Sequence, residues 1–426
     1  MQIHVVRPGD SLWGMSQAYS ISADEIAKAN EISDPNRLVI GQALVIPITG
    51  SFYWVMPRDS LYSISRKLNV PINVLVETNN ITNPNQLVIG TRLYIPPAYK
   101  PSKEASSYID VEMTSENTEE EVNKVGELLT YLNIFSYSVN RDGTLTPTDD
   151  TSAINAAKNN GILPLLVITN YEDGTFSQDL ATTILSNEEL QNKLLNNALK
   201  IMQEKGYKGI DFDFEYLGKD NRVPYNEFVT KAANFFQPKG YYVSSALAPK
   251  ISSTQVGTLY EGHDYAAHGE VLDFIFIMTY EWGWSGGPPY AVAPINEVRK
   301  VMNYTVTQIP RNKIMMGIPL YGYDWTLPYV KGGKWAKVVS PQQAIEIAAN
   351  HGAVINYDYS VQSPYFNYYD NEGNQHIVWF EDARSIQAKF NLVKNLGIRG
   401  FYYWALGPDF PQNWLLIEDN FNIVKK

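Results

Sequence analysis

From about residue 108 onward, apolar and polar positions form two alternating kinds of segment. Short apolar runs of strand length are separated by stretches in which apolar residues recur at helical spacing, such as 188–206 and 224–237. Eight strand-like runs can be counted: 108–113, 131–139, 162–169, 209–215, 241–248, 271–280, 313–322 and 398–406. This alternation predicts an α/β fold with a parallel sheet, and eight units suit a closed (β/α)8 TIM barrel over 108–426.

The interval between the seventh and eighth runs is much longer than the others. It contains a helical stretch near 341–351 and a predicted hairpin at 367–380, where two aromatic runs flank a glycine-containing turn. A final helix is expected at 383–395. We therefore expect a small α+β insertion at 323–382, between strands 7 and 8. An open doubly wound sheet is the alternative, but no glycine-rich phosphate loop follows the first run.

The N-terminal part of the chain repeats itself at an offset of 49 residues. Each copy is predicted to run strand, helix, helix, strand, and Asp10-Ser11 and Asp59-Ser60 are placed to cap the first helix of each copy. The core of about 45 residues is very small, which favours two independent modules, 1–48 and 51–97, over a solenoid. The stretch 98–107 is rich in Pro, Ser and charge, and it is predicted to be a linker.

Both copies resemble the LysM family. The residues that carry the resemblance in the first copy are Pro8-Gly9-Asp10-Ser11-Leu12-Trp13, Asn30, Asp34-Pro35-Asn36, Gly41 and Ile46-Pro47. The resemblance implies small βααβ modules that bind glycans containing N-acetylglucosamine, such as peptidoglycan or chitin. The second copy has Arg58 in place of Gly9 and Tyr62 in place of Trp13, so equal affinity is not expected. A structural module that binds nothing is the alternative.

Composition and charge narrow the function further. The net charge of −11 argues against nucleic acid as a partner, because phosphate binding needs a basic face. The 29 Tyr, 9 Trp and 16 Phe suit either aromatic cores or stacking platforms for sugar rings. Without cysteine, disulfides and thiolate nucleophiles are excluded. None of the five histidines has metal-ligand spacing, so no metal and no cofactor is expected: His4, His263, His268, His351 and His376.

The stretch YKGIDFDFEY carries an acid at every second position: Asp211, Asp213 and Glu215. On a strand these side chains share one face, about 6–7 Å apart, while Phe212 and Phe214 point to the other side, toward helices. The acids would face the barrel axis with Glu215 nearest the mouth, where barrel active sites lie. Acids so close cannot all ionise, so one keeps its proton with a raised pKa, as a general acid requires. Strand capping or pairing with Lys or Arg is the alternative, at a high desolvation cost.

The run 209–215 is similar to the catalytic signature of glycoside hydrolase family 18, the family of chitinases and related N-acetylglucosaminidases. Further support comes from Met278-Thr279-Tyr280-Glu281 in the sixth run, GIPLYG at 317–322, Trp404 in the eighth run and the insertion before it. The resemblance covers 108–426. Two positions depart from the family pattern: Lys208 stands where the signature has its first Asp, and ITNYEDG at 168–174 replaces the usual Ser-x-Gly-Gly. The second departure is expected to change the shape of the substrate-binding groove more than the catalytic chemistry.

The resemblance implies a role for each residue by position. Glu215 would be the general acid and base. Asp213 would hydrogen-bond Glu215 and then the acetamido group of the substrate, with Asp211 beneath the pair. Tyr280 would hold the acetamido carbonyl, and Trp404 would form the floor under the sugar at the cleaved bond. The pocket would be lined by Met278, Glu281 and Tyr321.

The family is an exception to the two-carboxylate rule of retaining glycosidases, because the substrate's own acetamido oxygen is the nucleophile. The alternative, Asp213 as nucleophile, predicts activity on sugars without an acetamido group. Two glycan-binding repeats joined to such a barrel resemble the spore cortex-lytic N-acetylglucosaminidases of spore-forming bacteria. We therefore expect hydrolysis of β-1,4 bonds after N-acetylglucosamine in peptidoglycan.

The expected site of action is the spore coat or cortex, or the cell wall. The chain shows no signal peptide pattern at its start and no run of about 18 apolar residues that would span a membrane. A monomer is expected. A chitinase and a catalytically inactive glycan-binding lectin remain the alternatives.

Overall fold

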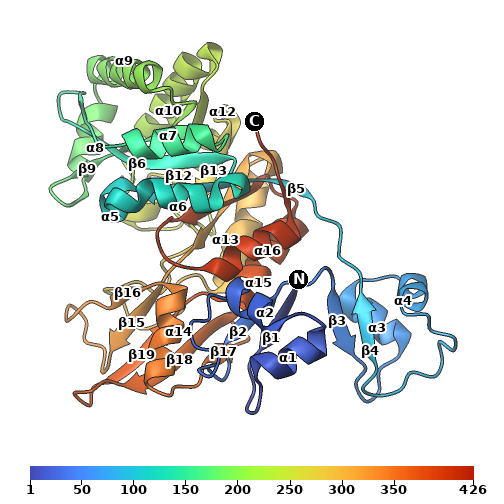
Figure 1. The fold of residues 1–426 in the computed structure, drawn as a ribbon. Helices are drawn as coiled ribbons and strands as arrows, with labels where there is room; N and C mark the ends of the chain where they lie inside the picture. Colours follow the sequence, from blue (N-terminus) through green and yellow to red (C-terminus); the bar gives the residue numbers. More distant parts are fainter.

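The computed structural model describes residues 1–426, which form two small modules followed by a barrel that carries an inserted subdomain (Figure 1). Eight parallel strands form the barrel, in the order β5-β6-β8-β11-β12-β13-β14-β20, and β5 pairs with both β6 and β20 to close it. These strands are β5 (Ser102–Asp110), β6 (Tyr131–Val139), β8 (Leu163–Thr169), β11 (Gly209–Asp213), β12 (Tyr242–Leu247), β13 (Phe274–Ile277), β14 (Ile314–Pro319) and β20 (Gly400–Trp404). The predicted TIM barrel is confirmed.

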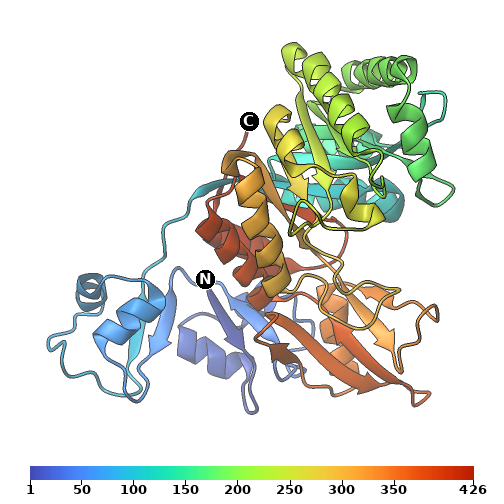
Figure 2. The same ribbon diagram turned by 180° about the vertical axis from the view of Figure 1, so that it is seen from behind.

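Helices cover the outside of the barrel (Figures 1 and 2). The principal ones are α6 (Thr118–Val125), α7 (Thr151–Asn159), α8 (Gln178–Leu185), α9 (Glu188–Lys205), α10 (Arg222–Phe236), α12 (Tyr265–Val271), α13 (Ile295–Gln308), α15 (Ala383–Leu396) and α16 (Pro411–Asn420). The two helices predicted from periodicity correspond to α9 and α10, and the expected final helix is α15. The pattern did not reveal α16, which packs against α15 near the C-terminus.

The first barrel strand lies earlier than predicted. We expected a linker over 98–107 and a strand over 108–113, but β5 begins at Ser102, and Val111–Thr114 form the short helix α5. Residues 102–107 read as linker because they are polar, yet their backbone pairs with three neighbouring strands. The negative charge of Glu104 is neutralised by ion pairs with Arg399 (2.5 Å) and Lys426 (2.8 Å).

The interior of the barrel is filled by side chains from seven of its eight strands. This cluster comprises Tyr108, Tyr131, Leu165, Val167, Ala246, Phe274, Phe276, Met315 and Tyr402. Strand β11 contributes no apolar residue to it, because its inward positions are Gly209, Asp211 and Asp213. A Cβ on Gly209 would lie 2.7 Å from both the Leu165 side chain and the Tyr242 carbonyl oxygen, so glycine permits the close approach of these strands.

The insertion between β14 and β20 is an antiparallel sheet with one helix, as the predicted α+β class requires. Its strand order is β16-β15-β19-β18-β17. The elements are β15 (Gly322–Thr326), β16 (Lys337–Val339), α14 (Pro341–Asn350), β17 (Asn356–Asp358), β18 (Ser363–Tyr369) and β19 (Gln375–Trp379). Strands β18 and β19 form the predicted hairpin, with Phe366 opposite Val378.

The N-terminal modules have the predicted βααβ order. The first consists of β1 (Gln2–Val5), α1 (Leu12–Tyr19), α2 (Ala23–Ala29) and β2 (Ala43–Ile46), and the second of β3 (Ser51–Trp54), α3 (Leu61–Leu68), α4 (Ile72–Thr78) and β4 (Arg92–Ile95). Ser11 and Ser60 cap α1 and α3, each accepting an N–H at 3.1 Å. The modules are not equally independent, because Ala43 and Val45 of the first belong to the main core of the barrel. None of the helices in the molecule is long and apolar enough to cross a membrane.

Candidate active site

Strand β11 presents two chemically different faces. Phe212 and Phe214 point outward, and their rings pack on Phe228 of α10, with ring centroids 5.1 and 6.1 Å away. Phe214 also stacks on Tyr225 at 5.7 Å. This apolar anchor places the acids at alternate positions on the opposite face, inside the barrel, as the spacing predicts.

Asp211 lies deepest and is fully buried. Its carboxylate accepts hydrogen bonds from the Tyr108 hydroxyl (2.5 Å), the Ser244 hydroxyl (2.7 Å) and the Asn133 amide (3.5 Å). Burial raises the pKa of Asp211 to about 6, while these three donors favour the ionised form and limit the rise. Asp211 is therefore the acid of the three that the barrel interior holds most firmly.

Asp213 lies one step nearer the mouth and has no such support. It is buried, and its Oδ1 has no hydrogen-bond partner. Burial raises the pKa of Asp213 well above its ordinary value, and the negative charges of Glu215 and Asp211 add to the rise. No hydrogen bond joins Asp213 to Glu215 in this structure, so Asp213, which lines the cleft, keeps a buried acceptor that the protein does not use.

Glu215 follows the end of β11, and its main chain is held on both sides by one residue. The Asn170 side chain accepts the Glu215 N–H at 2.9 Å and donates its amide to the Glu215 carbonyl oxygen at 2.9 Å. Burial raises the pKa of Glu215 to about 7, and the nearby charge of Glu281 contributes. The backbone is thus fixed while the carboxyl group remains available to a ligand.

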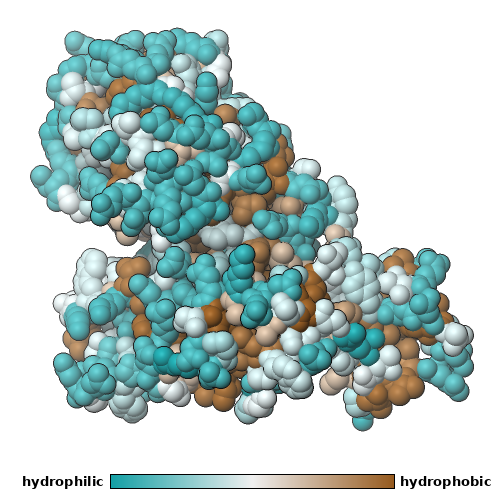
Figure 3. All heavy atoms as spheres, viewed as in Figure 1, coloured by the Kyte–Doolittle hydropathy of each residue, from teal (hydrophilic) through white to brown (hydrophobic).

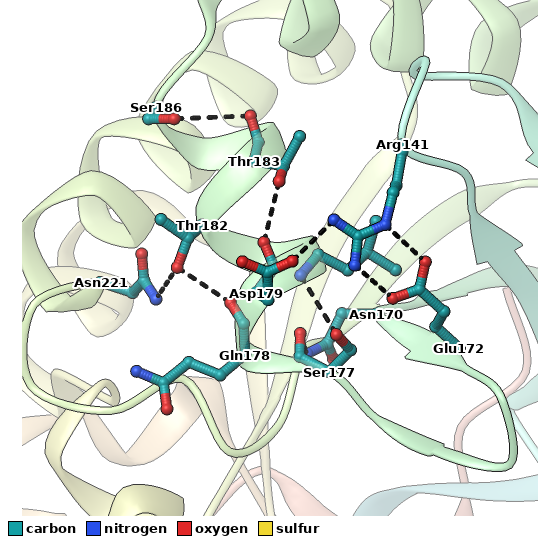
Figure 4. A network of polar contacts seen from close by, with 11 residues as sticks. Arg141, Asn170, Glu172, Ser177, Gln178, Asp179, Thr182, Thr183, Ser186 and Asn221 are labelled. Carbon is teal, nitrogen blue, oxygen red and sulfur yellow. Dashed lines mark hydrogen bonds and ion pairs between the residues drawn. The ribbon is translucent and has the colours of Figure 1, made fainter.

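Asn170 is itself fixed by the hairpin that follows β8, formed by β9 (Tyr171–Glu172) and β10 (Thr175–Phe176). The Ser177 N–H donates to the Asn170 carbonyl at 2.9 Å, and the Asn170 amide donates to the Ser177 carbonyl at 3.0 Å. Arg141 binds Glu172 through two hydrogen bonds of 2.7 and 2.8 Å and reaches Asp179 at 2.7 Å (Figure 4). The segment that departs from the family pattern therefore positions Glu215.

A buried histidine supports the neighbouring residue from the other side. The ring of His263 accepts the Ala248 N–H at 2.8 Å, so its other nitrogen donates to the Phe214 carbonyl at 2.8 Å. Burial lowers the pKa of His263 to about 4, which keeps the ring neutral. The histidine therefore has a structural role.

A cleft of about 500 Å³ opens above these acids at the C-terminal ends of the strands. Six of the predicted site residues line it: Asp213, Glu215, Met278, Tyr280, Glu281 and Trp404. Asp211 lies beneath the cleft, and Tyr321 lies behind its wall, so neither of these two predicted residues lines it. The Tyr280 hydroxyl is 3.1 Å from the Tyr402 hydroxyl, which anchors it at the barrel centre.

Glu281 forms the wall of the cleft toward the insertion. Its Oε1 accepts hydrogen bonds from the hydroxyls of Tyr321 and Tyr323, the latter at 2.8 Å. Burial raises the pKa of Glu281, and the two tyrosines limit the rise. This carboxylate is therefore already engaged by the protein.

Several cleft residues were not predicted. They are Tyr108, Phe135, Phe176, Tyr216, Ala246, Pro249, Leu259, Tyr260, Trp282 and Trp284. The high aromatic content was the only indication of them in the sequence. Lys208, at the departure from the signature, is exposed at the start of β11, at the opposite end of the strand from the cleft. It therefore takes no part in the site.

The fold and the acidic strand define a glycosidase barrel, and comparison with known proteins agrees. The model of glycosyl hydrolases family 18 matches residues 106–409, and the LysM domain model matches 4–47 and 53–96. The chain belongs to glycosyl hydrolase family 18 and carries two LysM domains.

Several relatives match this chain over its full length, and their names are more specific than the family name. The chain is 53% identical over 428 residues to the cortical fragment-lytic enzyme of Bacillus subtilis (strain 168), covering 100% of this chain and 99% of the relative. It is 47% identical to the enzyme of the same name from Bacillus anthracis, with 100% of both chains covered. The crystal structure of the Bacillus megaterium QM B1551 spore cortex-lytic enzyme SleL superimposes with a TM-score of 0.91, at 45% identity, covering 100% of this chain and 99% of that one.

Proposed function

We propose that the protein hydrolyses the β-1,4 bond after N-acetylglucosamine in spore cortex peptidoglycan during germination. The proposal rests on Glu215, an acid with a raised pKa whose backbone is fixed and whose carboxyl group faces the cleft beside the unpartnered Asp213. The relatives named as cortical fragment-lytic enzymes support the choice of polymer. The LysM domains would attach the enzyme to the glycan, and the site of action would be the spore or cell wall.

The state of the other carboxyl groups supports participation of the substrate. A carboxylate nucleophile must be ionised and free. Asp213 has a strongly raised pKa, and Glu281 is engaged by Tyr321 and Tyr323. The acetamido oxygen of the substrate is then the available nucleophile, as in the exceptions to the two-carboxylate rule.

In the first step, the acetamido oxygen attacks the anomeric carbon and the glycosidic bond breaks. Glu215 gives its proton to the leaving oxygen, and the sugar is left as an oxazolinium ion. Asp213 accepts a hydrogen bond from the acetamido N–H, and Tyr280 donates to the acetamido oxygen and orients it. Holding the nucleophile in place supplies an effective concentration that a free group would lack.

In the second step, Glu215 is a carboxylate and takes a proton from water as the water attacks the same carbon. The oxazolinium ring opens, and the product keeps its anomeric configuration. Trp404 forms the floor under the sugar, and Met278 lines the pocket. Asp211, held by its three donors, keeps the charge beneath Asp213 fixed throughout.

Parallel digestion of purified cortex fragments and chitin oligomers tests the substrate. We expect new reducing ends at N-acetylglucosamine from cortex fragments, and none with Glu215→Gln. Cleavage of chitin alone would refute the cortex assignment and leave a chitinase. No cleavage of either would favour a glycan-binding lectin.

A thiazoline analogue of the bicyclic intermediate tests the mechanism. We expect competitive inhibition, because the analogue occupies the place of the oxazolinium ion. Hydrolysis of substrates without the acetamido group, combined with no inhibition by the analogue, would instead support Asp213 as the nucleophile.

A further inference from the structure

The two LysM repeats share the sequence LVIG, at 38–41 and 87–90, but the surroundings of the two loops differ. Val39 of the first repeat is 5% exposed, whereas the matching Val88 of the second is 71% exposed. Ile40 and Ile89 are 40% and 63% exposed. The valine is thus covered in the first copy and open in the second, and the isoleucine is also less exposed in the first copy.

The insertion of the catalytic barrel covers the loop of the first repeat. Val39 belongs to the apolar core of the insertion, together with Ile355 and Phe366. The Ile355 N–H donates to the Ile40 carbonyl at 2.9 Å, and Arg37 donates to the Asn350 side chain at 2.8 Å. The loop therefore forms both apolar and polar contacts with the same subdomain.

The glycine that ends each LVIG segment gives a direct comparison. Gly41 and Gly90 have nearly the same backbone conformation, with φ of +86° and +84°. A Cβ on Gly41 would lie 1.8 Å from the Ile355 carbonyl oxygen, whereas a Cβ on Gly90 would have no neighbour within 4 Å. Only the first loop is pressed against another part of the molecule.

The repeats also differ in their connection to the barrel. Strand β2 and helix α2 of the first repeat pack on α15 and α16, and Arg384 donates to the Gly41 carbonyl at 3.1 Å. No hydrogen bond or ion pair links residues 51–96 to the barrel or its insertion. The second repeat binds its neighbour through Arg92, the Phe52 N–H and the packing of Trp54 on Tyr19, and it lies on the side of the first repeat away from the insertion (Figures 1 and 2).

The open loop of the second repeat carries an apolar cluster of Met56, Val88 and Ile89. All three are at least 55% exposed, and backbone hydrogen bonds between Val55 and residues 90–91 hold them together. Apolar atoms are visible on this repeat in Figure 3. Residues 51–97 contain four basic and two acidic side chains, a net charge of +2, whereas 1–48 contain three basic and five acidic, a net charge of −2.

We propose that the two repeats have different roles: the first is a fixed part of the catalytic unit, docked through residues 31–42, and the second attaches the enzyme to the glycan. This proposal rests on the proposed function, which it divides between the repeats. The basic charge of the second repeat suits peptidoglycan, which carries free carboxylates, better than it suits a neutral polymer.

Matched substitutions in the full-length chain test the proposal. With Glu215→Gln present to prevent cleavage, sedimentation with insoluble cortex peptidoglycan measures binding of Ile40→Asp and Ile89→Asp. We expect Ile89→Asp to weaken binding about tenfold, the loss that one apolar contact accounts for, and Ile40→Asp to leave it unchanged. The melting temperatures of Gly41→Ala and Gly90→Ala measure docking. Both substitutions introduce the same backbone strain, but only the Gly41→Ala Cβ would collide with the Ile355 carbonyl oxygen, so we expect the larger decrease for Gly41→Ala.

Equal weakening by the two Asp substitutions, or a larger effect of Ile40→Asp, would overturn the proposal. So would equal melting temperatures of the two Ala variants, or a failure of the chain with both loops intact to sediment with cortex. Hydrolysis of soluble cortex fragments by the active chain is measured separately. If hydrolysis fails but the sedimentation difference is found, the proposed reaction is wrong while the division of roles between the repeats stands.

Discussion

Glu215 and Glu281 line the same cleft, and the protein holds them in different ways. The main chain of Glu215 is fixed by Asn170, and no side chain of the protein binds its carboxyl group. The carboxylate of Glu281 is bound by Tyr321 and Tyr323, so the side chain itself is fixed. Both lie at strand ends and both have a raised pKa, so neither position nor acidity alone distinguishes them.

The difference indicates which glutamate can transfer a proton. A general acid must reach a leaving oxygen and must exchange its proton within one reaction cycle. A carboxyl group already bound by two hydroxyls would have to give up those hydrogen bonds first. We therefore propose that Glu215 transfers the proton and that Glu281 shapes the pocket.

Replacing both glutamates in the same way gives the largest expected contrast. Glu215→Gln removes the transferable proton, and we expect kcat on cortex fragments to fall by about 10³-fold or more. Glu281→Gln keeps an oxygen that accepts from both tyrosines, so we expect a change of about threefold or less at acidic pH. Initial rates of reducing-end release measure both. Similar losses in the two variants would refute the assignment of roles.

Asp213→Asn tests the next contribution on the Glu215 side. The change leaves only a neutral amide oxygen, a weaker acceptor for the acetamido N–H in the proposed mechanism, and puts an amide NH2 in place of the other oxygen, so we expect kcat to fall by about 10²-fold because the nucleophile is less well oriented. The thiazoline analogue should also bind more weakly to this variant, measured by calorimetry. If the rate falls but the affinity for the analogue does not, Asp213 acts on Glu215 and not on the acetamido group.

The acidic strand could be predicted because its signal is local. Alternation in 209–215 indicates which side chains share a face, and apolar Phe212 and Phe214 indicate which face is outside. The first barrel strand could not be located in the same way. Residues 102–107 are polar, and only pairing with β6, β20 and β21 (Asn422–Ile423), which are separate in the sequence, makes them part of the sheet.

Asn170 was missed for a similar reason. An asparagine beside Tyr171 and before Asp173-Gly174 reads as turn chemistry, and its contact with Glu215 spans 45 residues of chain. The docking of the first repeat is also invisible in the sequence, because Val39 and Val88 are the same residue in the same motif. In each case the missing information is which distant segment packs against the residue.

Asn170→Ala tests the support of Glu215, with Asn221→Ala as the matched control. Both asparagines donate to a main-chain carbonyl near the site, but Asn221 binds Leu217 and Thr182 and does not touch Glu215. We expect Asn170→Ala to lower kcat by about 10- to 100-fold, because a small displacement of the acid is costly. Asn221→Ala should lower the melting temperature by a similar amount while kcat remains within about twofold of the unsubstituted enzyme.

Asn170→Asp separates positioning from stability. It keeps the oxygen that accepts the Glu215 N–H but loses the donor to the Glu215 carbonyl, so we expect only part of the lost kcat to return. Equal kcat values for Asn170→Ala and Asn221→Ala, at equal melting temperatures, would mean that Asn170 is only structural.

The smallest expected effect is a change in pH dependence caused by Glu281. Burial raises the pKa of Glu215 to about 7, and the charge of Glu281 contributes to that rise. Glu215 must carry its proton to act as the acid, so kcat/KM should fall as the pH rises through about 7. Glu281→Gln removes the neighbouring negative charge, which makes ionisation of Glu215 easier, so the decline should begin at a lower pH. The pH profile of kcat/KM on soluble cortex fragments measures this shift. If the pH at which kcat/KM declines is unchanged or higher in Glu281→Gln, the charge of Glu281 does not raise the pKa of Glu215. The two glutamates would then differ only in the hydrogen bonds that hold them.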